Sequence, residues 1–114
     1  MTQDELNEVL RKHMAWLNDE KDGVRADLHG ADLREAYLRG AYLHGAYLHG
    51  ANIDFSCWPL WCGSKDVKVD ARIAAQLAAH FCVLDCDDPG YQAARTAILD
   101  FAKTSHRAED LGIK

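Results

Sequence analysis

The sequence lacks the features of a membrane or secreted protein. It has no apolar stretch long enough to cross a bilayer, and none that follows a basic N-terminus. Its first residues, MTQDE, are acidic, so we expect no secretory signal and predict a cytoplasmic protein. A basic excess is also missing, because 13 Lys and Arg stand against 18 Asp and Glu, for a net charge of −5. Direct binding of nucleic acid through a basic surface is therefore disfavoured.

The usual signs of catalysis are missing as well. There is no glycine-rich phosphate loop, no nucleophile motif and no carboxylate pair in an evident cleft, so we expect no enzyme and no cofactor. Cysteines occur in C-x4-C and C-x3-C pairs instead of the common C-x2-C spacing of zinc sites, with His80 nearby. We expect buried thiols and no metal, with a zinc site or, least favoured in a reducing compartment, a disulfide as the alternatives. The four cysteines are Cys57, Cys62, Cys82 and Cys86.

A repeat of five residues fills the middle of the chain. From Ala26 the sequence reads ADLHG, ADLRE, AYLRG, AYLHG, AYLHG and ANIDF, with alanine first and Leu or Ile third in each unit. A period of five matches neither a helix nor a strand. It predicts a coil whose sides each take five residues, with one small and one large apolar side chain pointing inward per side.

This pattern resembles the pentapeptide-repeat family, whose motif is A(D/N)LXX. The resemblance covers residues 26–55 and implies a right-handed quadrilateral β-helix with four pentads in each turn. Residues twenty apart would then stack, so that Asp27 lies beside Tyr47 and Asp32 beside Asn52. The run departs from the family by its shortness and by tyrosines that replace the usual Asp or Asn.

Helices are predicted on both sides of the repeats. Thr2 and Glu5 form a capping box before a helix over residues 3–18. Two more helices are predicted over residues 71–84 and 89–103, the latter after Asp88 and Pro89. For this last helix we expect an inward face, and from Ser105 we expect a frayed end. The inward residues would be Ala94, Ala97, Ile98 and Phe101.

The predicted fold class is therefore α+β, a short β-helix flanked by an N-terminal helix and a C-terminal helix pair. We expect residues 1–114 to form a single domain. Because so short a coil leaves its ends open, the flanking helices are interpreted as caps, and a homodimer is a second way to cover an end. The three parts are residues 1–25 (helix and connector), 26–60 (repeat coil) and 61–114 (helical cap).

The resemblance also suggests a function. The better understood members of the family are inhibitors that imitate the shape and charge of duplex DNA, and short members are carried by phages and prophages. We therefore predict a non-catalytic, phage-encoded inhibitor, similar to anti-CRISPR proteins, that blocks a basic DNA-binding surface of a host complex. The alternative is a structural or assembly module without inhibitory role, which binds through a tyrosine-rich wall. The residues expected to bind the partner are Asp27, Asp32, Asp54, Asp85, Asp87, Asp88, Tyr37, Tyr42 and Tyr47.

Overall fold

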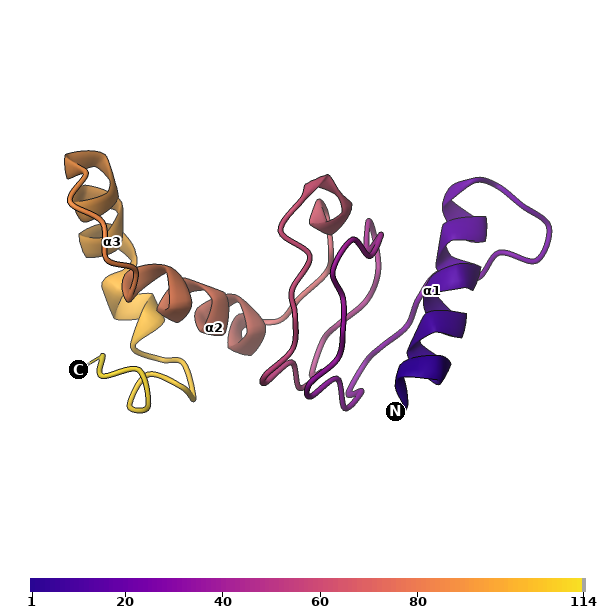
Figure 1. The fold of residues 1–114 in the computed structure, drawn as a ribbon, viewed down its shortest axis with the longest axis horizontal. Helices are drawn as coiled ribbons and strands as arrows, with labels where there is room; N and C mark the ends of the chain where they lie inside the picture. Colours follow the sequence, from indigo (N-terminus) through magenta and orange to yellow (C-terminus); the bar gives the residue numbers. More distant parts are fainter. Residues whose placement is uncertain (114) are drawn as a thin grey trace. The chain divides into compact units, whose positions relative to one another are not determined.

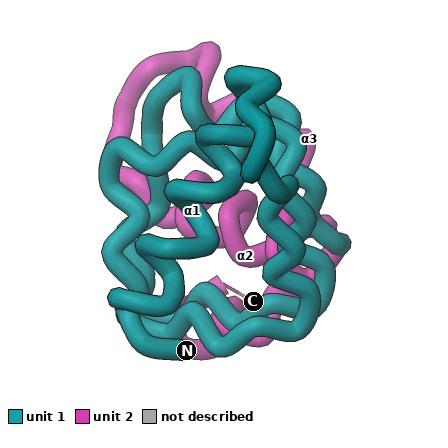
Figure 2. Tube along the Cα trace, turned by 90° about the vertical axis from the view of Figure 1, so that its right-hand side faces the viewer, with its two compact units in different colours: residues 1–70 teal, residues 71–114 magenta. Residues whose placement is uncertain are grey.

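The computed structural model describes residues 1–113, and its regular secondary structure is helical. Residues 1–113 form three α-helices: α1 (Gln3–Leu17), α2 (Ala71–Cys82) and α3 (Pro89–Ala102) (Figure 1). A short 3₁₀ turn, η1 (Cys62–Ser64), lies between α1 and α2. The chain divides into two compact units, residues 1–70 and residues 71–114 (Figure 2). That the whole chain folds as a single domain stays a prediction.

The predicted β-helix, and with it the α+β fold class, is wrong. Within residues 1–113 the repeats form no named strand and no sheet, only isolated parallel bridges such as Asp27 to Tyr47 and Asp32 to Asn52. The reason is the length of the repeat. A turn recurs in every pentad, and the extended stretch between two turns is too short to form a ladder. The flanking helices were predicted correctly and end within two residues of the expected limits.

Each pentad of the repeat coil (residues 26–57) closes on a tight turn. The backbone N–H of each alanine from Ala31 to Ala51 donates to the carbonyl of the Leu three residues before it, at 2.8–3.0 Å. The residue before that alanine has a positive φ, which glycine adopts without strain. Glycine fills most of these positions, but Glu35 adopts the same conformation with φ near 60°, as does Phe55 before Ser56. The third residues of the pentads are buried, with Leu43 and Leu48 fully inaccessible.

Helix α1 begins with the expected capping box. Thr2 Oγ1 accepts from the N–H of Glu5, and the Glu5 carboxylate accepts from the N–H of Thr2. The bond from the Thr2 N–H to the Glu5 carboxylate is the main cause that holds the pKa of Glu5 below its usual value, because it favours the ionised carboxylate. Leu6 and His13 of this helix are buried, so it packs through one face.

The second unit is built around α2 and α3. Asp88 caps α3, because its carboxylate accepts from the N–H of Tyr91 at 3.0 Å. The core of the unit contains small residues from both helices, with Ile98 and Leu99 packed against it. Its buried members are Ala79, Cys82, Ala102, Ala108 and Ile113.

Two sequence predictions fail in this unit. Ala94, Ala97 and Phe101 of the expected inward face are exposed, whereas Ala102 is inaccessible to solvent. Residues 105–113 are not frayed, because Ala108 and Ile113 complete the core. None of the helices in residues 1–113 has the length and apolar character needed to span a membrane.

Candidate interaction surface

The acids of the repeat coil do not form a row. Asp27 lies in one column with Tyr47 and Lys68, because Tyr47 bridges to both. Asp32 lies in another column, beside Asn52. Asp27 and Asp32 each accept a hydrogen bond from the N–H two residues later, which stabilises the turn that follows. The repeated negative charge of a nucleic-acid backbone is therefore not reproduced along either column.

The remaining acids belong to different units of the chain, Asp54 to residues 1–70 and the other three to residues 71–114. Asp54 sits at a turn of the coil, where its N–H donates to the side chain of Asn52. Asp85, Asp87 and Asp88 are exposed in the segment between α2 and α3, and Asp88 is occupied as the cap of α3. A solvated acidic segment before a helix is explained by capping and by the helix dipole.

The three repeat tyrosines lie on different sides of the coil, not on one wall. Tyr37 bridges to Cys57, whereas Tyr47 bridges to Asp27 and Lys68. Tyr42 lies between them in sequence and its ring contacts Trp61, with the ring centroids 4.6 Å apart. The tyrosine-rich wall expected from the sequence is thus divided among three sides, and each tyrosine has its own surroundings.

A break in the spacing of the coil creates its most exposed apolar surface. The N–H of Leu38 donates to the carbonyl of Cys57, but the next such bond joins Leu43 to Gly63, one residue later than the repeat predicts. The bridge from Tyr47 to Lys68 carries the same extra residue. One residue has therefore been inserted between Cys57 and Gly63.

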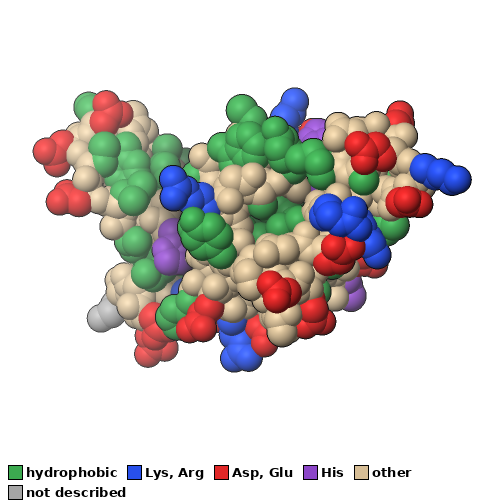
Figure 3. Space-filling model, turned by 45° about the vertical axis from the view of Figure 1, so that its right-hand side comes forward, with side chains coloured by type: hydrophobic (Ala, Val, Ile, Leu, Met, Phe, Trp, Pro, Cys, Tyr) green, Lys and Arg blue, Asp and Glu red, His purple; other side chains and the backbone are tan. Residues whose placement is uncertain are grey.

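The inserted segment projects apolar side chains into solvent. Leu60 is 93% exposed and Trp61 is 40% exposed. The Trp61 indole N–H donates to the carbonyl of Ala41 at 3.0 Å, and its ring meets Tyr42 edge to face. We call Tyr42, Leu60 and Trp61 the apolar bulge. Figure 3 shows one face of the molecule, on which hydrophobic side chains gather in a continuous group.

Gly63 is needed for this arrangement. A Cβ atom on Gly63 would lie 2.5 Å from the Trp61 ring and 2.6 Å from the carbonyl oxygen of Ala41. Backbone cannot yield easily at such distances, so only glycine allows Trp61 to lie against the coil here.

A second aromatic group lies where α1 meets the repeats. The Arg25 guanidinium lies over the ring of Tyr47 at 5.0 Å and over that of Trp16 at 5.9 Å. Trp16 stacks on His13, with centroids 5.5 Å apart. All of these aromatic and cation–π contacts are made within the chain. The contact with Arg25 is therefore a structural reason for a tyrosine at position 47.

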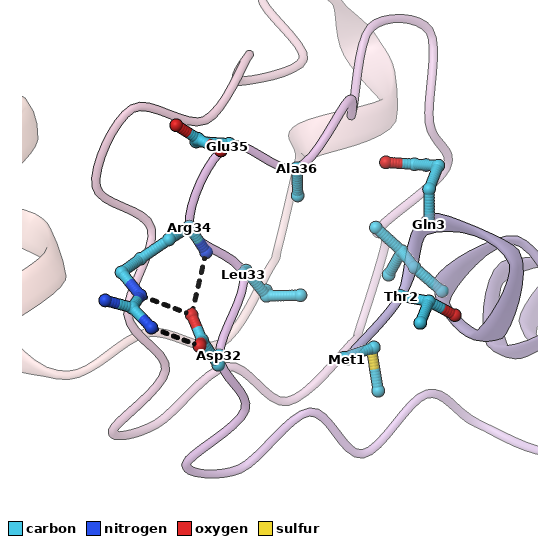
Figure 4. Close-up of a pocket in the computed structure, with 9 residues that line it drawn as sticks. Met1, Thr2, Gln3, Asp32, Leu33, Arg34, Glu35 and Ala36 are labelled. Carbon is cyan, nitrogen blue, oxygen red and sulfur yellow. Dashed lines mark hydrogen bonds and ion pairs between the residues drawn. The ribbon is translucent and has the colours of Figure 1, made fainter.

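A pocket of about 210 Å³ opens between the start of α1 and the turn at residues 32–36 (Figure 4). Two of its charged residues neutralise each other, because Arg34 holds Asp32 through two bonds of 2.7 and 2.8 Å, and Glu35 also lines the pocket. These bonds, together with the Arg34 N–H, hold the pKa of Asp32 well below its usual range. A group held ionised in an intramolecular pair is not available as a general acid or base.

The cysteines do not make the site that the zinc alternative requires. Within residues 1–113, no three His, Cys, Asp or Glu side chains gather closely enough to hold a metal ion. The absence of bound zinc itself stays a prediction. Only Cys82 is buried as expected, whereas Cys57, Cys62 and Cys86 are exposed, so the expectation of four buried thiols is wrong.

Comparison with known proteins supports the resemblance of the repeats and little else. Residues 24–57 match the family model for pentapeptide repeats, with eight copies. A search of curated proteins gave no match, and neither did a search of solved structures. The match covers less than half of the chain. It suggests a module for protein interaction and names neither a partner nor a reaction.

Sequence reasoning missed the apolar bulge for a definable reason. The stretch Cys57–Ser64 contains two Trp and one Pro and no longer repeats, so the sequence predicts that the coil ends at residue 60. The bonds of Leu43 and Leu48 show that the coil continues beyond this stretch with one residue added. Val67 and Val69 could have indicated this continuation, because two apolar residues separated by one polar residue are typical of an extended segment.

Proposed function

We propose that this chain is a protein-interaction module that binds its partner through the apolar bulge. The observation that carries the proposal is the inserted residue, which leaves Leu60 93% exposed beside a Tyr–Trp pair. Tyr and Trp are the residues most enriched in interface hot spots, and a projecting aliphatic anchor fits an apolar pocket on a partner. The partner class is thus a protein with an apolar groove.

A second proposal keeps the inhibitor predicted from the resemblance. In it, the chain is a phage-encoded, anti-CRISPR-like protein that presents Asp85, Asp87 and Asp88 to a basic, DNA-binding surface of a host complex. The net charge of −5 and the exposure of these acids support it. The division of Asp27 and Asp32 between two columns weighs against a regular DNA mimic. The cytoplasmic location and a homodimer likewise stay predictions.

The two proposals differ in which variants weaken binding. The full chain is used to isolate its partner from the natural host, and dissociation constants are then measured for the purified pair. Leu60→Ser removes an anchor that is almost fully exposed, so folding should be unaffected. We expect it to weaken binding at least tenfold, about 1.4 kcal/mol, with little dependence on salt. Tyr37→Ala is the matched control, since Tyr37 is 58% exposed in another column.

The acidic proposal makes the opposite prediction. Replacing Asp85 and Asp87 with Asn should weaken binding by a factor that shrinks as salt rises, because exposed charge pairs are screened. Asp88 is left intact in this variant, because it caps α3. If Leu60→Ser binds like the parent while the double Asn variant loses affinity only at low salt, the apolar bulge is not the contact.

A further inference from the structure

His13 joins helix α1 to the first turn of the repeats through both of its ring nitrogens. Its side chain is inaccessible to solvent. Nδ1 lies 2.9 Å from the backbone nitrogen of Ala26, and Nε2 lies 2.9 Å from the carbonyl oxygen of His44. An N–H can only donate and a carbonyl can only accept, so Nδ1 must be bare and Nε2 must carry the proton. Only the neutral imidazole, in this tautomer, makes both bonds.

These two bonds replace bonds that the repeat itself cannot make at its beginning. Elsewhere the pentad alanines donate to the Leu three residues before them, but the residue three before Ala26 is Gly23, which precedes the repeats. Likewise, the carbonyl of His49 accepts from the backbone of Gly30, nineteen residues earlier. The corresponding acceptor one pentad earlier is His44, and its carbonyl meets the ring of His13. One imidazole thus supplies the missing acceptor and the missing donor of the first turn.

Protonation would break this arrangement. A second N–H at Nδ1 would point at the N–H of Ala26, and both buried donors would lose their acceptor. Around the ring, Trp16 stacks from α1 itself, and Arg25 and His44 act on it from the repeats. Like charge from His44 and Arg25 opposes a charge on His13. Burial is the main cause that lowers the pKa of His13, and the bond to the His44 carbonyl only partly offsets it.

We infer that His13 is an acid-sensitive lock, which holds α1 on the start of the repeat coil when neutral and releases it when protonated. The direction of the pH effect follows from how many protons the folded and unfolded forms bind. Because the pKa of His13 is lower in the folded chain than in the unfolded chain, the unfolded or released form binds more protons. The lock is therefore fully effective above the unfolded pKa of about 6.5 and weakens as the pH falls below it.

The test follows individual amides in the wild-type protein by NMR from pH 7.5 to pH 4.5. Hydrogen-exchange protection factors are compared for Ala26, which donates to His13, and for Leu38, which donates to Cys57 inside the coil. We expect protection at Ala26 and along α1 to fall up to about tenfold per pH unit below 6.5, before protection falls at Leu38. If Ala26 keeps its protection while His13 becomes protonated, or if both amides lose protection together, there is no lock.

Two variants separate His13 from the other histidines. His13→Gln keeps one donor and one acceptor in a side chain that does not titrate, so the early loss at Ala26 should disappear. His29→Gln is the control, because His29 is exposed and should leave the transition unchanged. If His13→Gln shows the same pH dependence as the parent, another group is responsible. Should this variant not fold, the wild-type measurement alone decides the question. None of these results depends on the proposed partner binding.

Discussion

The two compact units fill their cores with side chains of different size. In residues 1–70, a column of leucines provides the buried volume, and Leu38, Leu43 and Leu48 are 1% exposed or less. In residues 71–114, the core relies on alanines, and Ala79 and Ala102 are inaccessible to solvent. A core of large side chains fails when volume is removed or charge is introduced, whereas a core of small side chains fails when volume is added. The units should therefore be sensitive to opposite kinds of substitution.

The largest effect is expected in the leucine column. Leu38→Asp places a carboxylate without a partner among buried apolar side chains, which costs several kcal/mol and is comparable to the whole stability of a small domain. We expect residues 1–70 to unfold, as measured by urea denaturation and by loss of amide dispersion in NMR spectra. Arg39→Asp, at the exposed neighbouring position, is the control and should remain folded. Near-native stability of Leu38→Asp would show that the buried column is assigned to the wrong residues.

A smaller effect is expected in the alanine core. Ala102→Leu adds volume where α3 meets α2, and overpacking of this kind costs about 1–3 kcal/mol. Ala97→Leu adds the same volume at an exposed position of the same helix and should change stability by less than about 0.5 kcal/mol. The free energy of unfolding from urea titrations decides between them. A larger loss of stability in Ala97→Leu than in Ala102→Leu would support the inward face that was predicted from the sequence.

This contrast explains how much the sequence could predict. The pentads identified their buried residues correctly, because one side chain type recurs at one position and its neighbours are set by the same repeat. In α3 an alanine is compatible with either face, so periodicity could not tell Ala97 from Ala102. The assumed β-helix failed for a third reason: the spacing predicted which residues lie side by side, but it did not predict that each extended stretch is too short to form a strand.

The candidate site was the least predictable part. Its residues are apolar and were visible in the sequence, but their exposure depends on one inserted residue between Cys57 and Gly63. An insertion of this kind can be recognised only when the repeat is known to continue after it. Most of the acids and tyrosines chosen from the sequence are exposed, but Tyr47 and Asp54 are half-buried. The columns of the coil separate those that lie in the repeats.

The smallest effect concerns the turn positions of the repeats. Glu35 adopts a positive φ of 62°, at the position where Gly40 has 72°. A residue with a Cβ atom is strained in this conformation by about 1–2 kcal/mol, and part of that cost is offset because glycine loses more freedom on folding. We therefore expect Glu35→Gly to raise the free energy of unfolding by about 0.5–1 kcal/mol. The N–H of Glu35 still donates to the carbonyl of Asp54 in this variant, because the bond uses only backbone atoms.

Gly40→Glu is the matched reverse exchange and should lower stability by a similar amount. Nothing lies within 4 Å of a Cβ atom there, so only the backbone conformation is tested. Urea unfolding of both variants measures the two differences. A loss of stability in Glu35→Gly, with no change in Gly40→Glu, would mean that side-chain contacts of Glu35 outweigh the strain of its turn.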